Sequence, residues 1–122
     1  MAVTLNHTIV YAQDREASAQ FLSEVLGLAA PEPFGPFLLV RTANDVSLDY
    51  YADAGPITHQ HYAFQVSEAE FDAIFGRLQQ RGSTYWADPM CSREGQVNHY
   101  NGGRGIYFRD PSGHLMEILT RP

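Results

Sequence analysis

The pattern of apolar and polar residues near the start of the chain predicts a strand followed by a helix. The strand alternates with period two, and its apolar face carries Val3, Leu5, His7 and Ile9. Asp14 is placed to cap the helix, whose apolar residues share one side, and Gly27 is placed to end it. The first part of the chain therefore predicts a strand and a helix that each bury one face.

The following segment is rich in proline and turn residues. Pro31, Pro33 and Pro36 are expected to exclude regular structure from their segment. Residues 37–41 and 46–51 are predicted as two short strands joined by a turn. The first half of the chain thus holds a strand, a helix and further strands.

The second half predicts the same order of elements. A strand is expected over 61–66, and Ser67 with Glu70 three residues later forms a capping box for a helix that ends at Gly82. A short strand is predicted over 84–86 and a long loop over 88–104. Two further strands are predicted over 106–109 and 114–120.

The two halves align with one another, which indicates an internal repeat. His7 and His61 lie at matching places in the first strand of each half. Asp49 and Glu117 match in the last strands, where the offset between the halves is larger, mostly because of the longer loop before Arg104. We therefore predict two copies of strand, helix and further strands.

Composition narrows the class of protein. The 122 residues suit one domain, and 44% apolar with 18% charged residues indicates a globular chain. A formal net charge of −6 argues against a nucleic-acid partner. Cys91 is the single cysteine, which excludes an internal disulfide and a cysteine-rich metal site. Without a long apolar run or a signal-peptide pattern, we expect no membrane partner and a cytoplasmic location.

Three side chains at matching places in the repeat point to a metal site. The strand phases put His7, His61 and Glu117 on inward faces, where an ionised carboxylate needs a cation or strong donors. Two imidazoles and one carboxylate form a ligand set for divalent transition metals that leaves positions open for substrate or water. The alternatives are that each histidine is a hydrogen-bonded structural residue and that Glu117 pairs with an arginine.

The residues Tyr107 to Ile118, with the sequence YFRDPSGHLMEI, and the two histidines that each open a strand resemble the vicinal oxygen chelate superfamily. This group contains glyoxalase I, fosfomycin-resistance and bleomycin-resistance proteins and extradiol dioxygenases. The resemblance implies one glyoxalase-like α+β domain over 1–122, with two tandem βαβββ modules, about 3–53 and 57–121, forming a curved mixed sheet around a metal and ligand site. In small members that site usually lies between two subunits, so a homodimer is expected.

Carried over by position, the resemblance makes His7, His61 and Glu117 the ligands of one divalent metal per site, Fe, Mn, Ni or Zn. His59 shares a face with His61 and is the alternative ligand. Asp49 stands where glyoxalase I enzymes have a fourth ligand. It is interpreted as a ligand, as a catalytic base beside the metal, or as a polar residue without a role in the chemistry.

The resemblance also suggests substrate contacts. Tyr107 lies ten residues before Glu117, like the tyrosine that binds the phosphonate in fosfomycin-resistance proteins. Arg104 resembles an anion-binding arginine of that group, and the alternative is a surface pair with Asp110 or Glu94. His99, in the long loop, is interpreted either as a substrate contact or proton-transfer group, or as an ordinary exposed residue.

Two classes of function follow. The first is a metal-dependent enzyme in which Glu117 and Asp49 are catalytic and a small oxygenated, anionic substrate chelates the metal. The reaction is then that of a lyase, isomerase, hydrolase, transferase or dioxygenase, since a Lewis acid supports each of these. The second class is a metal-free protein that sequesters an antibiotic or metabolite, as bleomycin-resistance proteins do.

Overall fold

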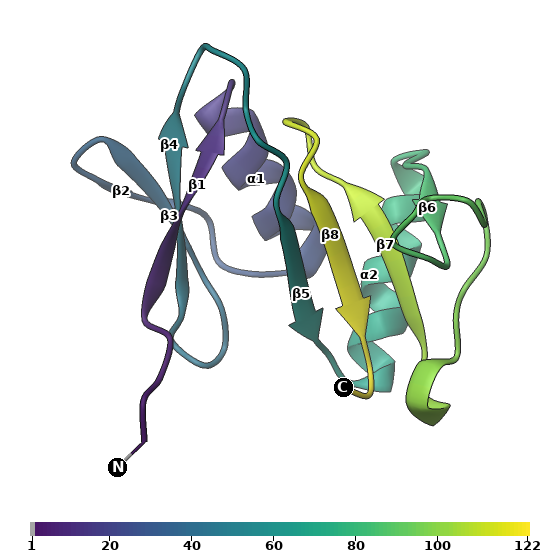
Figure 1. The fold of residues 1–122 in the computed structure, drawn as a ribbon. Coiled ribbons are helices and arrows are strands. Elements are labelled where there is room, and N and C mark those ends of the chain that lie inside the picture. Colours follow the sequence, from purple (N-terminus) through teal and green to yellow (C-terminus); the bar gives the residue numbers. More distant parts are fainter. Residues whose placement is uncertain (1) are drawn as a thin grey trace. The chain divides into compact units, whose positions relative to one another are not determined.

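Each half of the chain folds into a strand, a helix and three further strands (Figure 1). In the computed structural model, which describes residues 2–122, the first half contains β1 (His7–Ala12), α1 (Arg15–Leu26), β2 (Glu32–Phe34), β3 (Phe37–Arg41) and β4 (Ser47–Ala52). The second half contains β5 (His61–Gln65), α2 (Glu68–Gln80), β6 (Tyr85–Trp86), the short 3-10 turn η1 (Tyr100–Gly102), β7 (Gly105–Arg109) and β8 (Leu115–Leu119). The predicted α+β class with two βαβββ modules is confirmed.

The two halves have the same sheet topology. The strand orders are β1-β4-β3-β2 and β5-β8-β7-β6, with the first two strands of each order parallel and the others antiparallel. In β1 and β4, Ile9 pairs with Asp49, and in β5 and β8, Ala63 pairs with Glu117. The repeat seen in the sequence therefore extends to the register of single residues.

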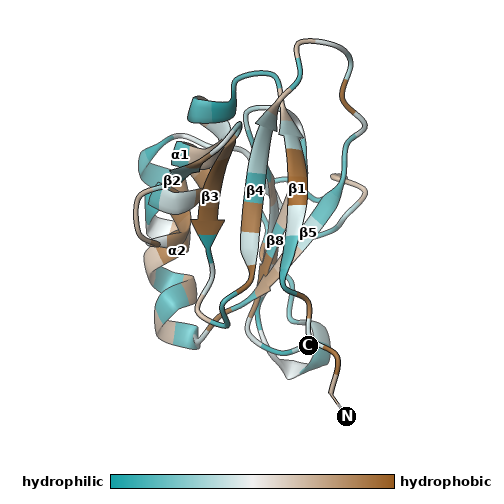
Figure 2. Ribbon diagram, turned by 90° about the vertical axis from the view of Figure 1, so that its left-hand side faces the viewer, coloured by the Kyte–Doolittle hydropathy of each residue, from teal (hydrophilic) through white to brown (hydrophobic). Residues whose placement is uncertain are grey.

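The helices begin and end largely as predicted. Asp14 Oδ1 accepts a hydrogen bond from the Ala17 backbone N–H at 3.0 Å, and Gly27 ends α1 with a φ of 71°. Both hydrogen bonds of the Ser67–Glu70 capping box are present. α1 packs against its own sheet, and Figure 2 shows the apolar stretch of β3 in brown.

The prediction for the first strand is wrong in its start and in its buried face. β1 begins at His7, and Val3 and Leu5 are 98% and 68% exposed. β4, the partner of β1, begins at Ser47 opposite His7, so residues 2–6 lie before the start of the paired segment. Within β1 the fully buried residues are Val10 and Ala12, so the face of His7 is the open one.

The proline-rich segment also differs from the prediction, because Pro33 lies in β2. This strand pairs with β3 alone, at the edge of the sheet. A proline is tolerated on an edge strand, where its missing N–H can face away from the ladder. The strand is three residues long, with Pro33 at its centre.

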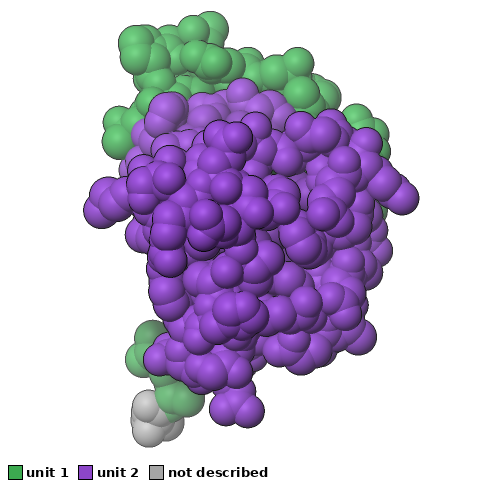
Figure 3. Space-filling model, turned by 90° about the vertical axis from the view of Figure 1, so that its right-hand side faces the viewer, with its two compact units in different colours: residues 1–58 green, residues 59–122 purple. Residues whose placement is uncertain are grey.

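The chain divides into two compact units, residues 1–58 and 59–122, which Figure 3 shows in green and purple. The first contains β1 to β4 with α1, and the second contains β5 to β8 with α2. Over residues 2–122, no helix combines the length and the apolar character needed to cross a membrane.

Candidate metal and substrate site

His61 and Glu117 meet on neighbouring strands of the second unit. His61 opens β5, Glu117 lies in β8, and their Nε2 and Oε1 atoms are 3.0 Å apart. The Glu117 side chain is 11% exposed and that of His61 is 46% exposed. A nearly buried carboxylate thus faces an imidazole ring that is about half exposed.

Tyr107 completes the surroundings of this pair. It pairs with Glu117 across β7 and β8, and its ring centroid lies 5.7 Å from that of His61. Burial raises the pKa of Tyr107 to about 12, and the charge and hydrogen bonding of Glu117 add to the shift. The phenol therefore keeps its proton at neutral pH and serves as a donor beside the carboxylate.

The corresponding positions of the first unit carry different chemistry. His7 is exposed, and its Nδ1 lies 2.7 Å from Asn6 Oδ1. Asp49 is buried and accepts a hydrogen bond from the Ser47 hydroxyl at 2.6 Å. Asp49 is thus held in place by Ser47, and any role for it beside a metal stays a prediction.

His59, the alternative to His61, is held by the turn between β7 and β8. Its ring lies against Gly113, where an added Cβ would be 2.5 Å from His59 Nε2. It also stacks edge-on against His114, with ring centroids 6.4 Å apart. These contacts favour His61, which faces Glu117, as the ligand.

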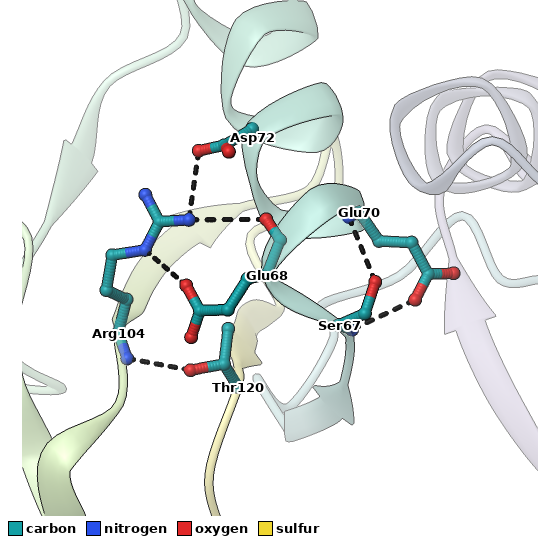
Figure 4. A network of polar contacts seen from close by, with 6 residues as sticks. All are labelled: Ser67, Glu68, Glu70, Asp72, Arg104 and Thr120. Atoms are coloured by element: carbon teal, nitrogen blue, oxygen red, sulfur yellow. Dashed lines mark hydrogen bonds and ion pairs between the residues drawn. The ribbon is translucent and has the colours of Figure 1, made fainter.

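Arg104 is engaged by the start of α2 (Figure 4). Its Nε donates to Glu68 Oε1 at 2.7 Å, and its Nη2 lies 2.9 Å from Asp72 Oδ1. The guanidinium also lies over the Phe71 ring, 4.3 Å from the centroid. The contacts show that Glu68 and Asp72, and not Asp110 or Glu94, are the partners of Arg104. Hydrogen bonds to these two carboxylates raise the pKa of Arg104.

Hydrogen bonds of Asp88 and Asn98 hold the two ends of the long loop before β7 in place. Asp88 accepts hydrogen bonds from the backbone N–H groups of Ser92 and Arg93. Asn98 is 5% exposed, donates to the Ala87 carbonyl at 2.8 Å and pairs with Gly105. His99 lies exposed just before η1. The contacts of Asn98 could not be read from the sequence, because its partners are not its neighbours in the chain.

Family comparison agrees with these features. Residues 4–118 match the family model described as Glyoxalase/Bleomycin resistance protein/Dioxygenase superfamily. The chain belongs to this superfamily. Membership confirms the resemblance inferred from the 107–118 stretch and the two strand-opening histidines.

Several members of the superfamily are similar over nearly the whole chain. The structure named Oxidase ChaP-H1 is 60% identical, has a TM-score of 0.97 and matches 99% of this chain and 98% of its own. Oxidase ChaP-H2 is 59% identical with a TM-score of 0.97, over 100% of this chain and 96% of its own. Glutathione transferase FosA of Serratia marcescens is 32% identical over 127 residues, which cover 97% of this chain and 81% of that protein.

The donors of the second unit fit a divalent metal of the kind that the superfamily implies. One imidazole nitrogen and one carboxylate oxygen converge from adjacent strands, and the carboxylate is nearly buried. Within each unit, over residues 2–122, no three His, Cys, Asp or Glu side chains form a metal-holding group. His7 belongs to the other unit, and its place in the ligand set rests on the sequence repeat.

Proposed function

We propose that this protein is a metal-dependent oxidase that acts on a small oxygenated, anionic substrate. The observation that carries the proposal is the His61–Glu117 pair at 3.0 Å, in a chain 60% identical to a protein named as an oxidase. Membership of the superfamily alone supports several reactions. The high identity to ChaP-H1 favours oxidation over the others.

His7, His61 and Glu117 are proposed as the ligands of one divalent metal, Fe, Mn, Ni or Zn. When bound, such a metal would supply a Lewis acid that stabilises negative charge on substrate oxygens. Glu117 supplies an anionic ligand from a nearly buried position. His61, the first residue of β5, presents Nε2 toward the Glu117 carboxylate.

The remaining site residues are proposed to act on the substrate. Tyr107 keeps its phenolic proton and is proposed to donate a hydrogen bond to the substrate beside Glu117. Asp49, which Ser47 holds, is proposed as a base that accepts a substrate proton. His99 is exposed at the loop and available to a substrate. Arg104 can bind the substrate anion only if its guanidinium leaves Glu68 and Asp72 and pairs with the anion instead.

We also propose that two copies associate. In the first unit, the open face of the sheet carries a group of exposed large apolar side chains: Ile9, Tyr11, Phe34 and Tyr51. The rings of Tyr11 and Tyr51 are in contact, with centroids 6.0 Å apart. A contiguous apolar patch of this kind is typical of a protein interface, and a second copy is the proposed occupant.

The test begins with metal binding and proceeds to oxygen uptake. Untagged protein is freed of metal, loaded with Fe(II), Mn(II), Ni(II) or Zn(II) in separate samples, and analysed for bound metal. Oxygen uptake is then measured with small α-hydroxy acids, α-keto acids and catechols. We expect one metal per chain and uptake with at least one metal and compound, both lost in His61→Ala.

Two results would contradict the oxidase. If the protein takes up none of the four metals but still binds a ligand, a metal-free protein that sequesters an antibiotic or metabolite is favoured. Metal binding with glutathione transfer but no oxygen uptake would favour a reaction like that named for FosA, to which the chain is 32% identical.

A further inference from the structure

The turn between β7 and β8 is closed by Asp110 and His114. Asp110 Oδ1 accepts hydrogen bonds from the backbone N–H groups of Ser112 at 3.0 Å and His114 at 2.8 Å. The Asp110 backbone N–H donates to the His114 carbonyl at 3.0 Å. Both residues are buried, with 5% and 1% of their surface exposed. The His114 backbone is therefore fixed from within the turn.

The His114 side chain reaches the residue before His61. Its Nδ1 accepts a hydrogen bond from the Gln60 backbone N–H at 2.9 Å, and the Gln60 carbonyl accepts one from the Leu115 N–H at 2.9 Å. The imidazole also contacts Tyr62 edge-on, with centroids 5.8 Å apart. Residues 114 and 115 thus hold both polar groups of the Gln60 backbone.

The first unit has the same turn without this imidazole contact. There the Thr42 N–H donates to the Val46 carbonyl at 2.9 Å, and the Ser47 N–H donates to the Asn6 carbonyl at 3.0 Å. Val46 stands where the second unit has His114, and a valine side chain has no acceptor. Gln60, the residue before His61, therefore makes a hydrogen bond to an imidazole that its counterpart in the first unit, Asn6, does not make to Val46.

We propose that His114 is a positioning residue for His61 as a metal ligand. His61 is the first residue of β5, and strand ends open readily unless tied. The Gln60–His114 hydrogen bond closes this end and fixes the backbone from which His61 Nε2 reaches Glu117. Since Glu117 lies three residues after His114 in the chain, the segment 114–117 holds one ligand and anchors the other.

The inference rests on the proposed metal site. A set of four proteins distinguishes failure of the positioning role from failure of the metal site. Metal-free wild type, His114→Val, His114→Asn and Leu78→Val are titrated with Co(II) alone and followed by its visible absorption. His114→Val recreates the arrangement of the first unit, whereas the amide oxygen of Asn can take the place of Nδ1 as acceptor. Leu78 is fully buried in α2, so Leu78→Val controls for lost stability.

We expect His114→Val to weaken Co(II) binding about tenfold or more, as removal of groups that orient ligands does. His114→Asn should stay within about threefold of wild type by the same standard. Leu78→Val should lower the free energy of unfolding without changing Co(II) affinity. Equal affinities of wild type and folded His114→Val would overturn the inference. A wild type that binds no Co(II) would instead overturn the metal site itself.

A measurement on wild type covers the case in which His114→Val does not fold. Coupling is reciprocal, so if the Gln60–His114 bond favours metal binding, metal must favour the bond. Saturation with Zn(II) should then slow hydrogen exchange of the Gln60 amide at least several-fold. The Gly95 amide, bonded to the Tyr85 carbonyl in the long loop, is the control and should not change. An unchanged Gln60 rate in Zn(II)-bound protein would refute the positioning role.

Discussion

Asp49 and Glu117 occupy the same register position in their own sheets, but different side chains surround them. Asp49 lies between Ile9 and Leu39 across its strands, and its carboxylate accepts a hydrogen bond from Ser47. Glu117 lies between Ala63 and Tyr107, and His61 Nε2 is 3.0 Å from its carboxylate. The repeat therefore preserves the position of the carboxylate while the second unit adds an imidazole and a phenol.

The first prediction concerns which histidine binds the metal. His61→Ala and Glu117→Gln should each weaken metal binding by more than the roughly 10–100-fold typical of residues that only orient ligands. His7→Ala should do the same. His59→Ala is the control, because His59 lies against Gly113 and not against Glu117. Metal content of dialysed protein checks the prediction, and loss in His59→Ala with full binding in His61→Ala would reverse the assignment.

Local signals in the sequence predicted the fold well. Asp14, Gly27 and the Ser67–Glu70 capping box depend on close neighbours in the chain, and the structure confirms them. The start of β1 depends instead on where β4 begins, at the distant Ser47, so alternation from Val3 onward was misleading. The strand at Pro33 was missed for a similar reason, because only its edge position makes it possible.

Strand phase predicted the placement of part of the candidate site, whereas contacts between residues distant in the sequence were not predictable. His61 and Glu117 follow from the repeat and from the alternation of their strands, whereas Tyr107 came from the family resemblance and its spacing of ten residues to Glu117. The partners of Arg104 do not follow from these signals, because Glu68 and Asp72 lie far from it in the sequence, on a helix. Their i, i+4 spacing, which puts both on one helix face, was the available signal.

The second prediction is the oligomeric state. Ile9, Tyr11, Phe34 and Tyr51 are each more than a third exposed on one face of the first unit, which favours association of two copies. Sedimentation at tens of micromolar should give about twice the 13.7 kDa mass of the chain. Tyr11→Asp should shift the population toward the single chain, because a charge in a buried apolar interface is costly. A wild type that sediments as one chain at this concentration contradicts the dimer.

The third prediction distinguishes two roles of Arg104. Because its guanidinium pairs with Glu68 and Asp72 and lies over Phe71, Arg104→Ala should lower the free energy of unfolding. Added salt should reduce that loss, since the ion pairs are partly exposed. If Arg104 also binds the substrate anion, affinity for α-hydroxy or α-keto acids should fall at least about tenfold, as for a charged hydrogen bond.

Asp72→Asn is the matched variant for this test. It weakens one ion pair and leaves the guanidinium in place, so it should lower stability. Because it also removes a competitor of the substrate anion, it should keep or raise anion affinity, in contrast to Arg104→Ala. Calorimetric titration of Arg104→Ala, Asp72→Asn and wild type gives both comparisons. Equal anion affinities in all three would leave Arg104 with a purely structural role.

The last prediction is an alkaline loss of stability that Tyr107 causes. Its pKa in the folded chain is about 12, whereas tyrosine in an unfolded chain has its ordinary value near 10. Above pH 10 the unfolded chain loses the proton first, so unfolding becomes more favourable until the folded phenol ionises as well. The stabilising contribution is thus complete below about pH 10 and is lost as pH rises toward about 12, with a limit of about 3 kcal/mol.

This chain suits the measurement because it contains no lysine, and tyrosine is the main side chain that titrates in this range. Urea unfolding of wild type, Tyr107→Phe and Tyr51→Phe at pH 9 and pH 11 gives the free energies to compare. Wild type and Tyr51→Phe should lose more stability over this interval than Tyr107→Phe does. Tyr51 serves as the control because it is 39% exposed and lies in the other unit. If Tyr107→Phe loses as much stability as wild type, the Tyr107 phenol is not protected by burial and by Glu117, and its role as a fixed donor in the site fails with it.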